Sequence, residues 1–130
     1  MPKNRLQKDG KVLADPEVED AGFFVAEGAS DAPFRTALHV HRHSDEFVHV
    51  LEGRLRVTIL EKSRDLTAGD NCFMPRTVPH RFEALEPSRW LVVGPPAYQA
   101  ERRALQQAAK AGLRGAELYA AIDGVDFVAE

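Results

Sequence analysis

Residues 39–53 of this chain have the sequence HVHRHSDEFVHVLEG. Successive side chains of a β-strand point to opposite faces, so His39, His41 and His43 would share one face, with neighbours about 6.6 Å apart along the backbone. Burying several imidazoles on one face is unfavourable unless their ring nitrogens find partners. This spacing lets two of the imidazoles converge on one ion, and the pattern therefore predicts a metal site.

The glutamate that follows these histidines requires a break in the strand. His43 and Glu46 have opposite parity, so a straight strand could not present both on one side. Ser44 and Asp45 therefore predict a turn or bulge, after which Glu46 opens the next strand and faces the same interior as the histidines. Alternation from this point predicts an inward face of Glu46, Val48 and Val50 and an outward face of Phe47, His49 and Leu51.

Short apolar runs separated by turn signals predict further strands on both sides of this stretch. Upstream we expect a short edge strand at 11–13, a strand at 22–26 that ends at Glu27-Gly28, a loop at 30–33 and a strand at 34–41. Downstream, Glu52-Gly53 predicts a hairpin turn, and Leu55, Val57 and Ile59 alternate with polar residues. Shorter strands are expected at 71–74, 80–84 and 89–93.

The last third of the chain changes from strand to helix character. Residues 99–111 are rich in Ala, Gln, Arg and Leu, which favour helix, and 116–122 suggest a second short helix. We expect Glu101, Arg102 and Arg103 to lie on the solvent face of the first helix. The predicted organisation is a polar segment at 1–20, a β-barrel at 21–96 and a helical segment at 97–130 that packs on the barrel.

Composition excludes several classes of function. The chain has 130 residues, 44% of them hydrophobic and 28% charged, which suits one globular domain with a real core. A net charge of −3 without a basic run argues against nucleic acid and anionic membranes as partners. No apolar run resembles a secretory signal or a membrane span. A single cysteine, Cys72, cannot form an internal disulfide, so we expect a cytoplasmic location.

The histidine-rich stretch resembles the first motif of the cupin superfamily. That motif is a Gly, then His-x-His, three or four residues, Glu, six residues and Gly. His39-Val40-His41, four residues, Glu46, six residues and Gly53 fit it. The leading Gly would fall on Pro33, which is a departure outside the ligand positions.

A second stretch resembles the second cupin motif, in which Gly, five residues, Pro-x-Gly, two residues and His are usually followed by Asn four positions later. Gly69, Pro75 and His80 stand at the matching positions, while Thr77 and Ala84 replace the second Gly and the Asn. Fifteen residues separate Gly53 from Gly69, as in small bacterial members. The helical tail resembles that of quercetin-dioxygenase-like cupins.

This resemblance implies an all-β fold, the cupin double-stranded β-helix or jelly-roll barrel, with a short helical C-terminal tail. It also selects the metal ligands, which strand periodicity alone leaves open: His39, His41, Glu46 and His80. His43 is then expected beside the ligands or in solvent. The cofactor would be one divalent first-row metal ion, Fe, Mn, Ni, Co, Cu or Zn, because imidazole suits all of these. The lack of a motif thiolate argues against a closed structural zinc site.

Apolar residues around such an ion would form both core and substrate pocket. The predicted pocket residues are Val48, Val50, Leu55, Val57 and Phe82. Glu46 could also act as a proton acceptor. Arg35 has the parity of the histidines and would be either a substrate anchor or a solvated charge. Cys72 is expected to be an inert, buried thiol.

The function implied by the resemblance is a non-haem metal-dependent dioxygenase acting on an aromatic or enolic small molecule. Two alternatives remain open: a metal-dependent isomerase, cyclase or lyase that needs no O₂, and a non-catalytic module that binds or senses a small molecule. A fold of this kind hosts many functions. We also expect a homodimer, formed through the outward face of Phe47, His49 and Leu51.

Overall fold

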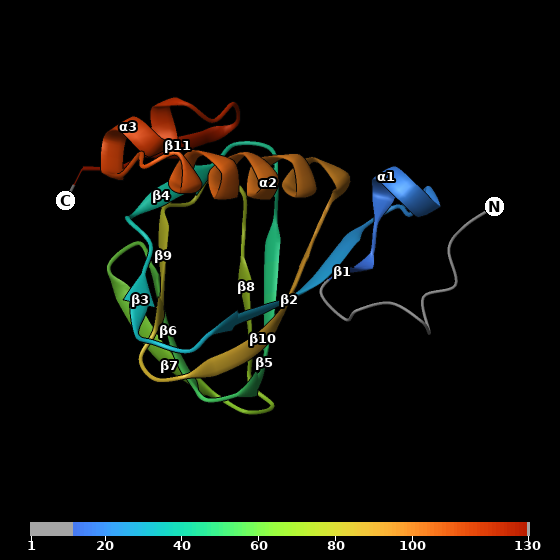
Figure 1. Ribbon diagram of the computed structural model, residues 1–130. Helices are drawn as coiled ribbons and strands as arrows, with labels where there is room; N and C mark the ends of the chain where they lie inside the picture. The colour runs from blue at the N-terminus through green and yellow to red at the C-terminus, as the bar shows by residue number, and fades with distance from the viewer. Residues whose placement is uncertain (1–11, 130) are drawn as a thin grey trace.

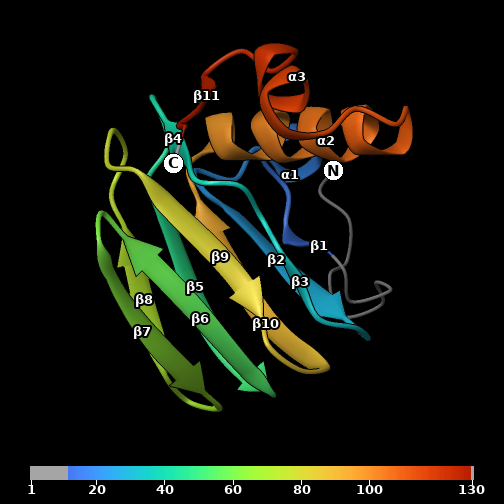
Figure 2. The same ribbon diagram turned by 90° about the vertical axis from the view of Figure 1, so that its left-hand side faces the viewer.

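The computed structural model describes residues 12–129, and it consists of two antiparallel β-sheets that face each other (Figure 1, Figure 2). Strands make up 45% of the residues and helices 21%. These features confirm the predicted jelly roll with a helical C-terminal part. The first sheet has the order β1-β2-β10-β5-β8, and the second has the order β11-β4-β9-β6-β7, with the short strand β3 paired to β9.

The strand bounds are as follows. The first sheet contains β1 (Val12–Ala14), β2 (Phe24–Ser30), β10 (Ser88–Gly94), β5 (Glu46–Glu52) and β8 (Asn71–Met74). The second contains β11 (Val125–Phe127), β4 (His39–His41), β9 (His80–Ala84), β6 (Arg54–Ile59), β7 (Lys62–Thr67) and β3 (Phe34–Arg35). The three helices are α1 (Pro16–Glu19), α2 (Pro96–Lys110) and α3 (Gly115–Ala120).

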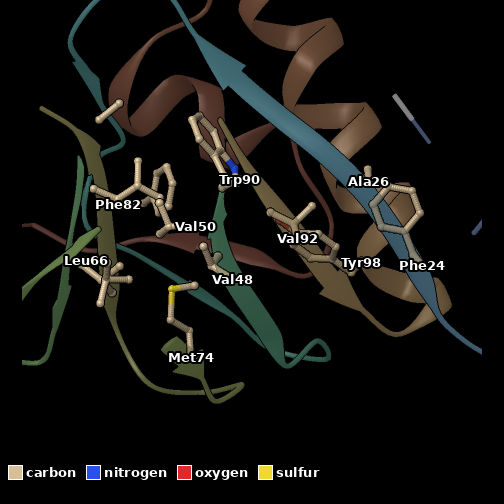
Figure 3. Packing of buried hydrophobic residues seen from close by; sticks show 13 residues of the cluster. Phe24, Ala26, Val48, Val50, Leu66, Met74, Phe82, Trp90, Val92 and Tyr98 are labelled. Atoms are coloured by element: carbon tan, nitrogen blue, oxygen red, sulfur yellow. The ribbon is translucent and has the colours of Figure 1, made fainter. Parts of the chain in front are cut away.

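The core lies between the two sheets and is formed by the inward half of each alternating strand. In β5, buried and partly exposed residues alternate from Glu46 to Val50, as the sequence pattern predicts. Figure 3 shows side chains from both sheets pointing toward one another in this space. Burying a Val, Leu or Phe side chain stabilises the fold by about 1.5–3 kcal/mol. The fully buried hydrophobic residues include Phe24, Val48, Val50, Leu55, Leu66 and Met74.

Helix α2 lies across one end of the barrel, and both ribbon views place α3 and β11 at the same end (Figure 1, Figure 2). Pro96 occupies the first turn of α2, where its missing N–H costs nothing and its fixed φ angle suits the helix. Strand β11 returns from α3 and pairs antiparallel with β4, Val125 opposite His41 and Phe127 opposite His39. The C-terminal part of the chain therefore both covers the barrel end and extends the second sheet.

The end of the strand predicted at Gly28 differs from the end that the structure shows. The predicted end of a strand at Glu27-Gly28 is wrong, because β2 continues to Ser30. A Cβ atom on Gly28 would lie only 2.3 Å from Trp90 Nε1 on the neighbouring strand. The glycine thus allows a close approach of the indole ring inside a strand, which is a recognised use of glycine in sheets.

Other boundaries also shift. The single strand expected over 34–41 is two strands, β3 and β4, separated by three residues. The first tail helix begins at Pro96 instead of 99, and the strands β7 and β11 were not predicted. Lys11 of the expected edge strand lies outside the described residues, but β1 pairs with β2 at this edge of the sheet. No helix within 12–129 combines the length and apolar character needed to cross a membrane.

Candidate metal centre

Three histidines meet at the end of the barrel that α2 covers. His39 and His41 lie on the buried face of β4, and His80 is the first residue of β9, directly opposite His39 in the antiparallel register. All three are at most 5% exposed. Their rings lie 4.5 to 5.4 Å apart between centroids. One nitrogen from each ring lies within 4.8 Å of the other two, which is close enough for a shared ion.

The carboxylate comes from the other sheet. Residues 42–45 form the predicted break after β4, and Glu46 opens β5 with its side chain buried. Asp45 holds this break in place, because it accepts hydrogen bonds from the backbone N–H and the guanidinium of Arg76. Glu46 Oε1 lies 3.5 Å from His41 Nε2 and 3.6 Å from His80 Nε2. The structure therefore brings together all four predicted ligands.

Hydrogen bonds fix the tautomers of two imidazoles. His39 Nδ1–H donates to the carbonyl of Ala37 at 2.7 Å, and His41 Nδ1–H donates to Oε1 of Glu101 at 3.0 Å. Because Nδ1 carries the proton in each ring, Nε2 keeps its lone pair. Metal-binding histidines generally donate their other ring N–H to a carbonyl or a carboxylate in this way.

Burial and charge keep His39 and Glu46 in the protonation states that a bound cation needs. Burial, together with the nearby His80, lowers the pKa of His39 from 6.5 to about 4, so the ring is neutral at pH 7. Burial alone would raise the pKa of Glu46, but its hydrogen bond to His80 and the electrostatic effect of the three nearby histidines outweigh burial and lower the pKa. Neutral imidazoles and an ionised carboxylate are the forms that bind metal.

Helix α2 contributes a buried carboxylate that the sequence analysis placed in solvent. The expectation that Glu101 lies on an exposed helix face is wrong, since it is 5% exposed and bonds to His41. Arg102 is only partly exposed, with its guanidinium carbon 5.7 Å from the centre of the Phe24 ring. Arg103 alone is exposed, and it pairs with Glu17 at 2.7 Å. The face of α2 turned to the barrel is therefore partly polar.

Two tyrosines from the C-terminal helices also reach the centre and were not predicted. Tyr98 on α2 is buried near Glu46, and burial together with the charge of that carboxylate raises the pKa of its phenol well above 10.0. Tyr119 on α3 stacks on His39, with ring centroids 5.1 Å apart. One helix face with the spacing i, i+3, i+4, i+7 contains Tyr98, Glu101, Arg102 and Leu105. This spacing is the one sequence signal that could have marked Tyr98, Glu101 and Arg102 in advance.

A cavity of about 310 Å³ opens beside the four predicted ligands. Of the five predicted pocket residues, Phe82 lines this cavity. Val48, Val50 and Leu55 are fully buried in the core and do not line it, whereas Val57 lines a second cavity next to Cys72. The cavity wall is instead built from rings and from the C-terminal helices: Phe34, Trp90, Tyr98, Arg102, Leu105 and Tyr119.

The remaining candidate residues lie away from the centre. His43 is exposed, and His49 bonds to the side chain of Asn71 on the outside of the first sheet. Arg35 is exposed with its guanidinium 4.0 Å from Glu83, so it is a solvated charge and does not line the cavity. Cys72 is only half-buried, so the expectation of a buried thiol is wrong, but partial burial still raises the pKa of the thiol, as expected for an unreactive cysteine.

The donor set suits a divalent transition metal. Three imidazole nitrogens and one carboxylate would leave one or two positions open on a five- or six-coordinate ion. Structural zinc sites are commonly closed by thiolates, and Cys72 is not part of the cluster. The residues present therefore fit a catalytic or ligand-binding metal better than a purely structural one.

Comparison with known proteins identifies related chains. A family model described as "Cupin domain" matches residues 23–94, which is more than half of the chain. An uncharacterized protein of Methanocaldococcus jannaschii is 28% identical over 105 residues, covering 76% of this chain and 84% of its own.

Solved structures show the same architecture. KdgF from a Halomonas species superposes with a TM-score of 0.58 at 23% identity, covering 69% of this chain and 82% of its own. A cupin-2 domain-containing protein of Shewanella frigidimarina gives a TM-score of 0.55 at 25% identity, covering 65% and 78% of the two chains. Both likenesses agree with the two-sheet barrel described above.

Proposed function

This chain belongs to the cupin domain family, and we propose that it is a metal-dependent enzyme, a non-haem dioxygenase acting on an aromatic or enolic small molecule. The proposed ligands of its single divalent ion are His39, His41, Glu46 and His80. The observation that carries this proposal is their convergence, with three imidazole nitrogens within 4.8 Å of one another and Glu46 beside two of them. A bound ion would supply Lewis-acid activation and positions at which small molecules bind.

The cavity wall supports an aromatic or planar substrate. Phe34 and Trp90 stack with centroids 6.2 Å apart, and Phe82 packs against Trp90 at 5.1 Å. These three side chains line the same cavity as the proposed ligands. Rings prefer offset or edge-to-face contacts with other rings, so this wall would orient a flat molecule beside the metal site. A volume of about 310 Å³ limits the substrate to a small compound.

Glu46 and Tyr98 provide a site for proton transfer. Glu46 is a weaker base than an ordinary carboxylate, because its pKa is lowered, so it accepts a proton most readily from an acidic substrate. The Tyr98 phenol, whose pKa is raised, holds its proton next to that carboxylate. Glu46 would accept the substrate's proton, and the protonated Tyr98 phenol would stay beside it as a hydrogen-bond donor.

The same pair favours a second candidate, an isomerase, cyclase or lyase that uses the metal without O₂. In such chemistry Glu46 would take a proton from one atom of the substrate and return it to another atom or to the leaving group, whereas a dioxygenase also consumes O₂. The experiment that separates them is an oxygen-electrode screen of iron-loaded protein with candidate enols, repeated under strict anaerobiosis. O₂ uptake that the H80A variant lacks and the H43A variant keeps would support the dioxygenase.

Other results of this screen lead to different conclusions. Turnover without O₂ would exclude the dioxygenase and support the second candidate. Tight ligand binding without any metal-dependent turnover would indicate a binding or sensing module instead.

We propose further that the protein is a homodimer joined through the outer face of the first sheet. Phe47 and Phe73 are register partners on β5 and β8, and Phe73 is 54% exposed. Phe23, also 54% exposed, lines a surface hollow with both. Exposed apolar patches of this kind mark protein interfaces. Light scattering should give twice the chain mass of 14.4 kDa, and the F73S variant should give the monomer mass. A monomeric wild-type protein would contradict the proposal.

A further inference from the structure

The cavity beside the metal centre contains one guanidinium. Among the residues that line it in the described part of the chain, Arg102 is the single Lys or Arg. It extends from α2 with its guanidinium carbon 5.7 Å from the centre of the Phe24 ring. That ring packs in turn against Tyr98, with centroids 5.9 Å apart, at the α2 end of the core (Figure 3). Arg102 is therefore held at the cavity by its contact with Phe24, whose ring packs on Tyr98.

No carboxylate within residues 12–129 forms an ion pair with Arg102, whereas its neighbours in sequence both have charged or polar partners. Glu101 is bonded to His41, and Arg103 pairs with Glu17 on the far side of the helix. Arg35, the cation that the sequence suggested as a substrate anchor, faces Glu83 instead. Arg102 thus carries a charge at the cavity that no described acidic side chain neutralises.

Charge balance at the centre indicates what would neutralise it. A divalent ion and Arg102 together supply three positive charges, and the carboxylates of Glu46 and Glu101 supply two negative charges. Imidazoles bind a metal ion in their neutral form and therefore add nothing to this balance. One positive charge remains in a partly enclosed, largely aromatic cavity, where an unpaired charge is costly. A ligand with one negative charge would remove this cost.

We propose that Arg102 binds the carboxylate of the substrate, so that the cavity takes a small aromatic or enolic monocarboxylate. This inference rests on the proposed metal-dependent function and names its substrate class. The guanidinium lies over the Phe24 ring, and a guanidinium that contacts a ring through its face can still form two parallel hydrogen bonds with a carboxylate through its N–H edge. The substrate's ring or enol would lie against Phe34, Phe82 and Trp90, next to the proposed ligands.

The test is calorimetric titration of the full-length, zinc-loaded protein with benzoate and phenylpyruvate, and with the neutral benzamide as a comparison. We expect both carboxylates to bind at one site per chain, and R102Q to weaken each at least tenfold. R102K should bind with intermediate affinity, since it keeps the charge but not the paired donors. R103Q is the matched control, because it removes an exposed arginine from the same helix, and it should bind like the wild type.

Several outcomes would overturn the proposal: equal carboxylate binding by wild type and R102Q, equal loss in R103Q, benzamide binding as tight as benzoate, or no carboxylate binding by the wild type. Zinc content, measured by elemental analysis on the same samples, separates this inference from the function on which it rests. If the protein holds one zinc per chain but its carboxylate binding does not depend on Arg102, only the proposed substrate class is overturned. Zinc lost on dialysis of the wild type overturns the metal site itself, whatever Arg102 does.

Discussion

His41 Nδ1 and Glu101 Oε1 lie 3.0 Å apart, although sixty residues separate them in the chain. His41 belongs to the first strand of the histidine motif, and Glu101 belongs to the helix that covers the barrel end. Their hydrogen bond fixes the imidazole tautomer and its orientation toward Glu46. The C-terminal helix is therefore part of the candidate metal centre, not only a cover on the barrel.

Removing the Glu101 carboxylate should weaken metal binding without abolishing it. We expect E101A to lower the affinity for a divalent ion by roughly 10- to 100-fold, the usual effect of losing such a partner. E101Q should lose less, because its amide oxygen still accepts the Nδ1 proton. Competition with a chromophoric chelator gives the affinities, and Q107A on the exposed side of the same helix is the control. Equal affinities for wild type and E101A would show that this hydrogen bond does not support the site.

Gly124 should also affect the position of the Glu101 carboxylate, through its second oxygen atom. A Cβ at this position would lie 2.8 Å from Glu101 Oε2, and the residue has φ +88°. G124A should therefore both strain the backbone, by about 1–2 kcal/mol, and push Glu101 away from His41. G112A is a matched control, with φ +93° and open space around it. Chemical denaturation should show similar destabilisation of both variants, but only G124A should lose metal affinity. Loss of affinity in both would contradict the role assigned to Gly124.

Local pattern accounts for what could be predicted of this centre. The alternation of His39 and His41, the break at Ser44 and Asp45, and the inward position of Glu46 follow from strand geometry over a few residues. His80 was added to this set only by the resemblance to the second cupin motif. The register that places it opposite His39 could not be derived from the sequence around His80.

The contributions of the C-terminal helices depend on tertiary docking. Glu101 and Arg102 lie among Glu, Arg and Gln residues that look like an ordinary solvated helix surface, and nothing local distinguishes the buried carboxylate. Strand β7 begins with the polar sequence Lys-Ser-Arg-Asp. It forms because β6 offers a full edge for pairing, in which Arg54 pairs with Thr67 at one end and Ile59 pairs with Lys62 at the other. The sequence predicts a strand end at Gly28 because the residue it packs against, Trp90, is distant in sequence.

Gly28 should be intolerant of any side chain. Its Cβ would meet three atoms of the Trp90 ring at 2.3 to 2.8 Å, so G28A must displace the indole from the cavity wall. We expect a loss of about 1–3 kcal/mol in the free energy of unfolding, measured by urea denaturation. G22A, where no atom lies within 4 Å, should have little effect. A G28A protein as stable as the wild type would mean that the indole can move at little cost.

Acidification should destabilise the metal-free protein. The folded state holds the pKa of His39 at about 4, whereas the free side chain has a pKa of 6.5. Between these pH values the unfolded chain binds a proton that the folded chain does not, so stability is present above pH 6.5 and falls toward pH 4. The loss from this residue can reach about 3 kcal/mol. The lowered pKa of Glu46 adds a further loss in the acid range below 4.5.

Urea denaturation of chelator-treated protein at pH 7.5, 6 and 5 measures this effect. The H39N variant removes the titrating ring, and its stability should change less over the same range. A pH dependence identical to that of the wild type would show that His39 is not the group responsible.

The most direct measurement of the central claim is an anomalous diffraction experiment on crystals grown from protein loaded with one equivalent of Zn²⁺ or Fe²⁺. We predict a single strong peak at the metal's absorption edge, enclosed by His39, His41, Glu46 and His80 and within about 2.0–2.2 Å of their nitrogen and oxygen ligands. Absence of a peak among these four side chains, or a peak beside His43 or His49 instead, would contradict it.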